Sequence, residues 1–184
     1  MPTLPWVEPT VDKAIPSTSA QTEPSPPADT ASVEALWDAY RASNPAVPAT
    51  PPPAWHFCDN RPDAAECLAL VLAGRKRATA SSAAFFALQN EPLPAPGDHS
   101  VVTDFDGTAE CIIRTTRVTV LPMDQVTTEM AATEGEGDGS LEYWRAVHWA
   151  YYARELAGTG VPVSRGLEVV FEEFEVVWPA PRHE

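Results

Sequence analysis

The chain has little positive charge, and this scarcity excludes several classes of partner. Its 12 Lys and Arg residues face 26 Asp and Glu residues, which gives a formal net charge of −14 over 184 residues. Sequence-independent binding to nucleic acid depends on Lys and Arg neutralising phosphates, and anionic membranes attract basic segments. We therefore expect no DNA partner, no membrane partner and no broad RNA groove, whereas a compact nucleotide pocket stays open.

Cysteine and long apolar runs are also scarce. Cys58, Cys67 and Cys111 are odd in number and lie far apart, without a CxxC motif, so the sequence predicts neither a disulfide framework nor a zinc site. No apolar run approaches the roughly 18 residues of a membrane helix. The N-terminus also lacks the basic and apolar regions of a signal peptide. We expect a cytoplasmic protein that uses no metal or other cofactor.

Large apolar side chains are few in residues 1–31, which are rich in Pro, Ser, Thr and Ala. Such a segment cannot bury enough surface to offset the entropy of ordering it. We predict a disordered tail over 1–31, with Trp6 an isolated aromatic residue, and a short C-terminal tail over 180–184. The length and the 44 % apolar content suit one domain with its own core, over residues 32–179.

Apolar periodicity and capping residues predict four helices. Val33, Leu36, Trp37 and Tyr40 follow the i, i+3, i+4, i+7 spacing of an amphipathic helix. A second helix begins near Pro62 and ends before Gly74. A third covers 126–133 with Asp124 as its cap, and a fourth begins at Ser140 and ends by Gly158.

Alternating apolar residues predict an antiparallel sheet. Residues 101–103 and 110–120 form a hairpin with its turn at Asp106-Gly107. In a last strand over 167–178 the apolar residues change from odd to even positions, so we expect a bulge near Glu172-Glu173. Several short strands among these helices predict an α+β fold with a small, curled antiparallel sheet or partly open β-barrel.

The run Arg75-Lys76-Arg77 is the one stretch of three consecutive basic residues in this acidic chain. One interpretation is a solvated turn. The other is a pocket that holds a lysine and a hydroxyl, because flanking arginines and burial both favour a neutral Lys76 that could act as a base toward Thr79. Strand residues three apart point to opposite faces. Lys76 and Thr79 can therefore share a pocket only if Lys76 still lies in the loop when Thr79 enters the strand.

Further candidates follow Glu134. The acidic stretch Glu134, Glu136 and Asp138 is interrupted by glycines, which favours a mobile solvated loop over a cation site. Trp144 either packs its helix on the sheet or stacks a base. Arg145 and His148 lie about one helical turn apart, and they either face a cleft or form a surface pair.

Four segments together resemble the ASCH domain family of the PUA-like superfamily. Phe57-x-Asp59, a helix, and Gly74-Arg-Lys-x-Ala-Thr79-Ala-Ser81 are similar to the opening of that domain, and Pro96-Gly97-Asp98 is similar to its P-G-D turn. The segment from Glu134 through Trp144 to His148 resembles its E-G…S…W…H stretch. The resemblance covers residues 33–178. Cys58 departs from the pattern, because relatives usually have Gly there.

The resemblance implies a PUA-like barrel with a cleft that holds the G-x-K-x-x-T motif. It also implies an activity, since members are amidohydrolases of acylated cytidine, RNA binders or single-strand ribonucleases. The implied catalytic residues are Lys76, Thr79 and Glu134, with Glu136 as the second choice for the acid. The residues expected to bind substrate are Arg75, Arg77, Ser81, Glu136, Trp144, Arg145 and His148.

The leading hypothesis is a metal-independent amidohydrolase that acts on N(4)-acetylcytidine or a similar small amide. Thr79 would attack the acyl carbon, Lys76 would take its proton, and Glu134 would polarise or protonate the leaving amine. The partner is then a small nucleoside or nucleotide. The alternatives are a non-catalytic RNA-binding or regulatory module and a single-strand ribonuclease, for which the partner is single-stranded RNA.

Overall fold

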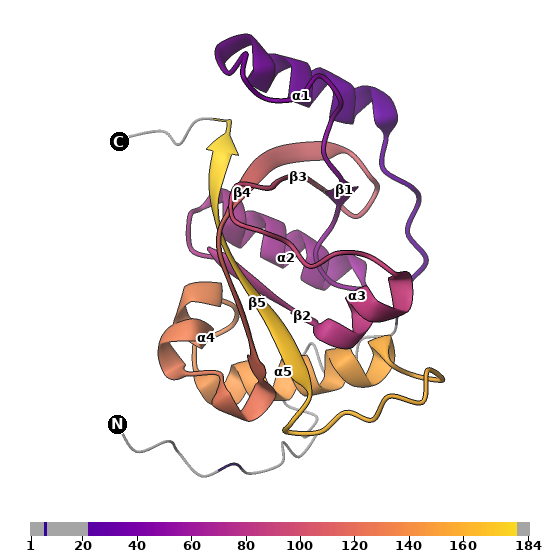
Figure 1. Cartoon of the computed structure of the whole chain (residues 1–184), viewed down its shortest axis with the longest axis vertical. Helices are drawn as coiled ribbons and strands as arrows, with labels where there is room; N and C mark the ends of the chain where they lie inside the picture. Colours follow the sequence, from indigo (N-terminus) through magenta and orange to yellow (C-terminus); the bar gives the residue numbers. More distant parts are fainter. Residues whose placement is uncertain (1–5, 7–21, 180–184) are drawn as a thin grey trace.

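The computed structural model describes Trp6 and residues 22–179, which form one five-stranded sheet with helices around it (Figure 1). The elements in chain order are α1 Thr30–Ser43, β1 Ala54–Trp55, α2 Arg61–Leu72, β2 Ala78–Ser82, α3 Ala83–Gln89, β3 His99–Thr103, β4 Ala109–Pro122, the 3-10 helix η2 Met123–Gln125, α4 Thr128–Glu134, α5 Leu141–Glu155 and β5 Glu168–Trp178. None of the helices in this described part is long and apolar enough to cross a membrane.

The strand order is β1-β3-β4-β5-β2, with β1 parallel to β3 and every other pair antiparallel. The predicted α+β class is therefore confirmed, but the sheet is mixed rather than wholly antiparallel. Among the described strands the two edges, β1 and β2, pair with one neighbour each and not with one another. The sheet is open, and the expected closure into a barrel is not confirmed.

Helices cover both faces of the sheet, and the pleat decides which residue meets which helix. Successive strand residues point to opposite faces. Val101 and Ile112 pack in a cluster with α1, whereas the next residues, Val102 and Ile113, pack with α2. A third cluster joins α4 and α5 to β2 and β5, and it contains the buried Phe171. Figure 1 shows α1 at one end of the molecule and α4 with α5 at the other.

The two long strands β4 and β5 hold the sheet together. The predicted hairpin of β3 and β4 is confirmed, but the bulge predicted near Glu172-Glu173 of β5 lies on the partner strand. The extra residue there is Thr116 of β4, because Thr115 pairs with Phe174 and Arg117 with Glu173. The extra residue of β5 is Val177, because Ile112 pairs with Trp178 and Ile113 with Val176. β5 lies between β4 and β2, and its residues from Val169 to Glu172 are all buried. A strand covered on both faces needs no single apolar phase, which removes the reason for a bulge there.

The predicted helices are present, with changes at their starts. Asp29 accepts a hydrogen bond from the backbone N–H of Ala31, so α1 begins at Thr30. Asp124 lies inside η2, and Thr127 caps α4 in its place. Ser140 caps α5 as predicted. These caps satisfy N–H groups that have no partner within the first helical turn.

Residues 22–29, which the sequence places in the tail, run along the domain. The backbone N–H of Glu23 donates to the carbonyl of Asp59 at 2.8 Å, and Ser25 contacts the His56 ring at 2.9 Å. Trp6 is not isolated, since its ring centroid lies 6.1 Å from that of Trp149. The rest of the predicted tail, 1–5 and 7–21, and the C-terminal tail 180–184 lie outside the described residues.

We expect Asp29→Ala to lower the free energy of unfolding by about 1 kcal/mol, because α1 loses its N-cap. Urea unfolding with an unchanged m-value measures this loss. Asp38→Ala is the control, since within the described part of the chain the exposed Asp38 pairs with Arg41 on the same helix, and such a pair contributes less than about 0.5 kcal/mol. Equal effects of the two substitutions would show that Asp29 is not a cap.

Candidate functional site

Lys76 lies in the short loop between α2 and β2. Gly74, with a φ of +70°, ends the helix, and β2 begins only at Ala78. Lys76 is therefore still in the loop when Thr79 enters the strand, as the pocket hypothesis requires. Arg75 and Arg77 are exposed, whereas Lys76 is 1 % exposed. One residue of the basic run thus points inward while its neighbours point to solvent.

Two carboxylates enclose the Lys76 ammonium. Its Nζ donates to Glu134 Oε1 at 3.0 Å and to Glu136 Oε1 at 2.5 Å. Glu134 ends α4, and Gly135 follows with a φ of +69°. A Cβ atom at Gly135 would lie 2.6 Å from the carbonyl oxygen of Arg75, so only glycine lets the two loops approach this closely. The expected mobile solvated loop is wrong for Glu134 and Glu136, which are held against Lys76.

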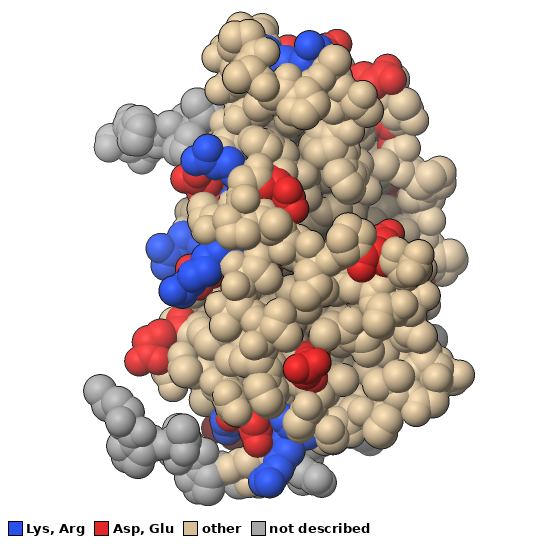
Figure 2. All heavy atoms as spheres, viewed as in Figure 1, with Lys and Arg blue, Asp and Glu red and all other residues tan. Residues whose placement is uncertain are grey.

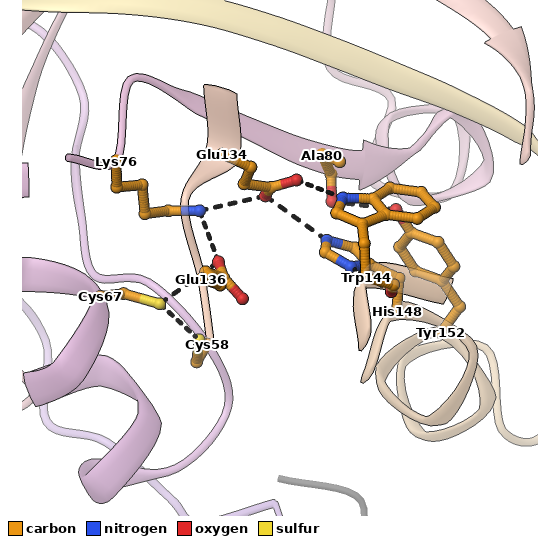
Figure 3. Close-up of polar contacts among 9 residues, drawn as sticks. All are labelled: Cys58, Cys67, Lys76, Ala80, Glu134, Glu136, Trp144, His148 and Tyr152. Carbon is orange, nitrogen blue, oxygen red and sulfur yellow. Dashed lines mark hydrogen bonds and ion pairs between the residues drawn. The ribbon is translucent and has the colours of Figure 1, made fainter. Parts of the chain in front are cut away.

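Glu134 also joins the cluster to α5 (Figure 3). Trp144 Nε1 donates to Glu134 Oε2, and His148 Nε2 lies 3.4 Å from Glu134 Oε1. The other ring nitrogen of His148, Nδ1, donates to the carbonyl of Trp144 at 2.9 Å. A carbonyl can only accept, so a second donation from Nε2 needs a doubly protonated ring. The rings of Trp144 and His148 are stacked with centroids 4.1 Å apart.

The charges of this cluster reverse the expected protonation of Lys76. Burial lowers the pKa of Lys76, but the carboxylates of Glu134 and Glu136 outweigh burial and raise that pKa above its ordinary value. The expectation of a neutral lysine is therefore wrong, since the flanking arginines point to solvent and the lysine points at two acids. Burial raises the pKa of Glu134, but Lys76 and His148 outweigh it and lower that pKa to about 2.

His148 titrates in the same network. Burial lowers the pKa of His148, and the Glu134 carboxylate beside it more than compensates, so the pKa rises above its ordinary value. At neutral pH the cluster therefore holds a charged Lys76, an ionised Glu134 and an imidazole that is protonated more readily than usual. Each charge depends on the others because all three side chains are buried.

A cleft of about 1030 Å³ opens beside this cluster. Five of the residues predicted for the site line it: Thr79, Ser81, Glu134, Glu136 and His148. β2 alternates, so that Thr79 and Ser81 face the cleft while Ala78 and Ala80 are buried in the core. The hydroxyls of Thr79 and Ser81 thus line the same cleft as the carboxylates of Glu134 and Glu136.

The other predicted residues lie elsewhere. Lys76 and Trp144 stand behind the carboxylates and do not line the cleft. Arg75 and Arg77 are on the surface. Arg145 faces away from the cleft, with its guanidinium 4.9 Å from the ring centroid of Trp6. The expectation that these five residues touch a substrate directly is therefore not supported by their positions.

Sequence reasoning missed several residues of the cleft. Arg154 binds Asp59 through two hydrogen bonds of 2.7 and 2.9 Å, and Ser82 Oγ donates to Glu155 at 2.6 Å. A signal for Glu155 was present, because His148, Tyr151 and Glu155 follow the i, i+3, i+7 spacing of one helix face. The sequence named Asp59 only as part of the Phe57-x-Asp59 motif and gave no sign of its partner Arg154, which is 95 residues away.

The cleft is strongly acidic. Eight carboxylate residues line it: Asp59, Asp63, Glu91, Asp98, Glu134, Glu136, Glu155 and Glu172. Among the described residues that line it, Arg154 is the one Lys or Arg, and it is already bound to Asp59. In the described part of the chain, no three His, Cys, Asp or Glu side chains are grouped to hold a metal ion. The arrangement favours an uncharged or cationic ligand.

We expect Glu134→Gln to lower the free energy of unfolding by roughly 3 kcal/mol at pH 7, because it leaves the buried Lys76 with one carboxylate. The lowered pKa of Glu134 means that its ionisation stabilises the fold above pH 4.5 and that this contribution is lost as the pH falls toward 2. The difference between the two proteins should therefore shrink over that window in urea unfolding measured from pH 7 to 2.

Glu175→Gln is the matched control for this measurement. Glu175 pairs with Arg114 across the exposed surface of β4 and β5, and such pairs contribute about 1 kcal/mol or less. A loss at Glu134 no larger than the loss at Glu175 would mean that the buried carboxylate does not hold the Lys76 charge.

Comparisons with known proteins identify the family and support the fold. The chain matches the family model of the ASCH domain over residues 53–178. It is similar to protein EF3133 from Enterococcus faecalis V583, with 30 % identity and a TM-score of 0.75 over 81 % of this chain and 90 % of that chain. It is also similar to an ASCH domain from Lactobacillus crispatus JV V101, with 31 % identity and a TM-score of 0.72 over 79 % and 94 %. A comparison with curated proteins found no match. The family match spans more than half of the chain, and the chain therefore belongs to the ASCH domain family.

Proposed function

We propose that this chain is a hydrolase of small amides, with N(4)-acetylcytidine or a similar acylated nucleoside as its substrate. One observation carries the proposal: a buried network of Lys76, Glu134, Glu136 and His148 opens onto the cleft that Thr79 lines. Burying charges costs more than burying apolar residues of the same volume. Such a network beside a cleft is therefore typical of a functional site rather than of a scaffold.

The charges of the network change the roles that the family resemblance implies. Lys76 is protonated at neutral pH, so it supplies positive charge and does not accept the Thr79 proton. Glu134 is enclosed by three donors, which makes it a poor base. Glu136 is the carboxylate with access to the cleft, since its side chain is 20 % exposed. Figure 3 shows the second oxygen of Glu136 turned away from Lys76.

In the proposed reaction the Thr79 hydroxyl attacks the acyl carbon and gives its proton to Glu136. The C–N bond of the amide breaks, and the amine leaves with that proton, which returns Glu136 to its ionised form. Glu136 then takes a proton from water, and the resulting hydroxide attacks the acyl carbon. The bond between that carbon and the Thr79 oxygen breaks, the acid leaves, and Glu136 returns the proton to the Thr79 oxygen. Lys76 offsets the negative charge of both carboxylates, and Glu134 and His148 hold Lys76 in place.

Charge supports a small uncharged substrate over RNA. The cleft is lined by acids, and phosphates would be repelled there. On the face shown in Figure 2, Lys and Arg side chains lie beside Asp and Glu side chains and form no continuous basic patch among the described residues. Arg114 and Arg117 are each paired with an acid, in the ion pairs Arg114–Glu175 and Arg117–Glu173. RNA-binding modules need unpaired basic groups along the path of the backbone.

We expect Thr79→Ala and Glu136→Gln each to lower kcat/KM for the best small amide by a factor of about 100 or more, since each removes a reacting group. The double variant should lose little beyond either single variant, because the two groups serve one mechanism. The rate is measured as the release of the free amine, which is detected by chromatography.

Two variants serve as controls for this experiment. Ser81→Ala removes a neighbouring hydroxyl on the same face of β2 that takes no part in the proposed steps, so it should lower the rate far less than Thr79→Ala. Thr79→Ser retains a nucleophile and should recover part of the activity that Thr79→Ala loses. Activity of Thr79→Ala close to that of the wild type would refute Thr79 as the nucleophile.

A second experiment tests the sign of the substrate charge. An acylated cytidine and its 5′-phosphate differ only in the phosphate, and we expect a lower kcat/KM for the phosphorylated form. The difference should narrow as salt rises from 0.01 to about 1 M, because salt screens the repulsion from the acidic cleft. A faster reaction of the phosphate, or tight binding of single-stranded RNA at physiological salt, would favour the RNA-directed alternatives.

A further inference from the structure

Two thiols meet beside the charge cluster, in a contact that the proposed hydrolysis does not use. Cys58 Sγ lies 3.5 Å from Cys67 Sγ, and the Cys67 thiol donates to Glu136 Oε1 at 3.4 Å (Figure 3). Both are free thiols, as is Cys111, which is fully buried in β4. The pair is built by the turn before α2 and by α2 itself, so its members are nine positions apart in sequence.

The two thiols differ in access. Cys58 is half-buried and lines the cleft, in a turn where its φ is +59°. Cys67 is 4 % exposed on the inner face of α2. The hydrogen bond with Cys58, burial and the Glu136 carboxylate all raise the pKa of Cys67, so Cys67 keeps its proton and donates it. A reagent in the cleft therefore reaches Cys58 first, with Cys67 in contact behind it.

We propose that Cys58 and Cys67 are an oxidation site, at which a peroxide converts the two thiols into a disulfide that alters the cleft. The formation of the disulfide depends only on the geometry of the two thiols. Its effect on catalysis rests on the proposed function.

The oxidation takes two steps and uses Cys58, Cys67, Glu136 and one molecule of hydrogen peroxide. The Cys58 sulfur attacks one oxygen of hydrogen peroxide, the O–O bond breaks, and the departing hydroxide takes the Cys58 proton, so that the products are a sulfenic acid and water. The Cys67 sulfur then attacks that sulfur and passes its proton to Glu136 Oε1, which already accepts its hydrogen bond. The S–O bond breaks, and the departing hydroxide regains the proton as water. One peroxide is reduced and two thiols are oxidised.

Closing the disulfide changes the wall of the cleft. A disulfide has an S–S distance of about 2.05 Å, so the sulfurs must approach by roughly 1.5 Å. Cys67 is fixed in a helix, and the turn around Cys58 must therefore move. That turn contains Phe57, whose ring centroid lies 5.3 Å from Lys76 Nζ, and Asp59, which Arg154 holds. Glu136 also loses its thiol donor. The oxidised form should therefore bind and convert ligands less well.

The full chain offers a direct test by mass spectrometry. Trypsin leaves both thiols on the single peptide 42–75, because Arg61 is followed by Pro62, while Cys111 falls on the peptide 78–114. After peroxide treatment of the folded protein, unfolding and alkylation, we expect peptide 42–75 to lack two hydrogen atoms and to carry no alkyl group. Peptide 78–114 should carry one alkyl group.

Two matched variants remove one sulfur each. Cys67→Ser keeps a hydroxyl that can donate to Glu136, and Cys58→Gly suits the positive φ of the turn. Neither should form the disulfide. A wild-type protein in which Cys58 stops at a sulfenic or sulfinic acid while Cys67 is still alkylated would overturn the proposal. A disulfide that involves Cys111 or a second chain would overturn it as well.

The effect on the cleft is read as a ratio of rates before and after oxidation. Hydrolysis by the wild type should fall at least several-fold and return on treatment with a dithiol reductant, while the ratio for Cys67→Ser and Cys58→Gly should stay near one. A disulfide that leaves the wild-type ratio near one would refute the coupling to the cleft. The mass measurement needs no substrate, so its result stands even if the proposed hydrolysis fails.

Discussion

The arrangement of the site depends on one buried ammonium group. Lys76 is almost fully buried between the carboxylates of Glu134 and Glu136, and a charge removed from water is tolerated only when it is paired. This pairing fixes the end of α4 against the loop before β2. The bonds from Trp144 and His148 to Glu134 then fix α5 in the same place. The loop before β2 and the α4–α5 pair, which lie far apart in sequence, are thus held together at one edge of the cleft.

The same pairing decides which chemistry the cleft can support. The ammonium group of Lys76 is paired with Glu134 and Glu136, and the guanidinium group of Arg154 is paired with Asp59. The cleft therefore presents hydroxyls and carboxylates, not unpaired cations, to a ligand. This combination favours nucleophilic attack on a small uncharged amide and disfavours phosphate groups. Arg75 and Arg77 are exposed and do not line the cleft, so they do not contribute to its lining.

The turn before α2 connects the cleft with two other features of the molecule. Asp59 accepts hydrogen bonds from Arg154 and, through its backbone carbonyl, from Glu23 of the segment 22–29. Cys58 in the same turn contacts Cys67, which donates to Glu136. A change in the conformation of this turn should therefore alter the surroundings of Glu136, which we propose as the base, and those of the segment 22–29. Oxidation of the two thiols is one such change.

Local patterns in the sequence missed α3 but were enough to predict the other four α-helices of the described residues and the β3–β4 hairpin. These features follow from apolar spacing, caps and turn residues within a few positions of one another. The sequence alone also showed the family resemblance, which predicted Thr79, Glu134, Glu136 and His148 as residues of the site. It could not show that the sheet is mixed and open, since strand pairing joins residues that are distant in the chain.

Only the tertiary structure shows that Lys76 is protonated and that Glu134 is enclosed while Glu136 reaches the cleft. In the sequence Lys76 has two arginine neighbours, which predict a lowered pKa for its ammonium group. In the fold those arginines turn to solvent, and the nearest charges are carboxylates 58 and 60 positions away. A pKa depends on burial and on charges a few ångströms away in space, not on neighbours in sequence. The contact between Cys58 and Cys67 has the same origin, because folding places the turn against the buried face of α2.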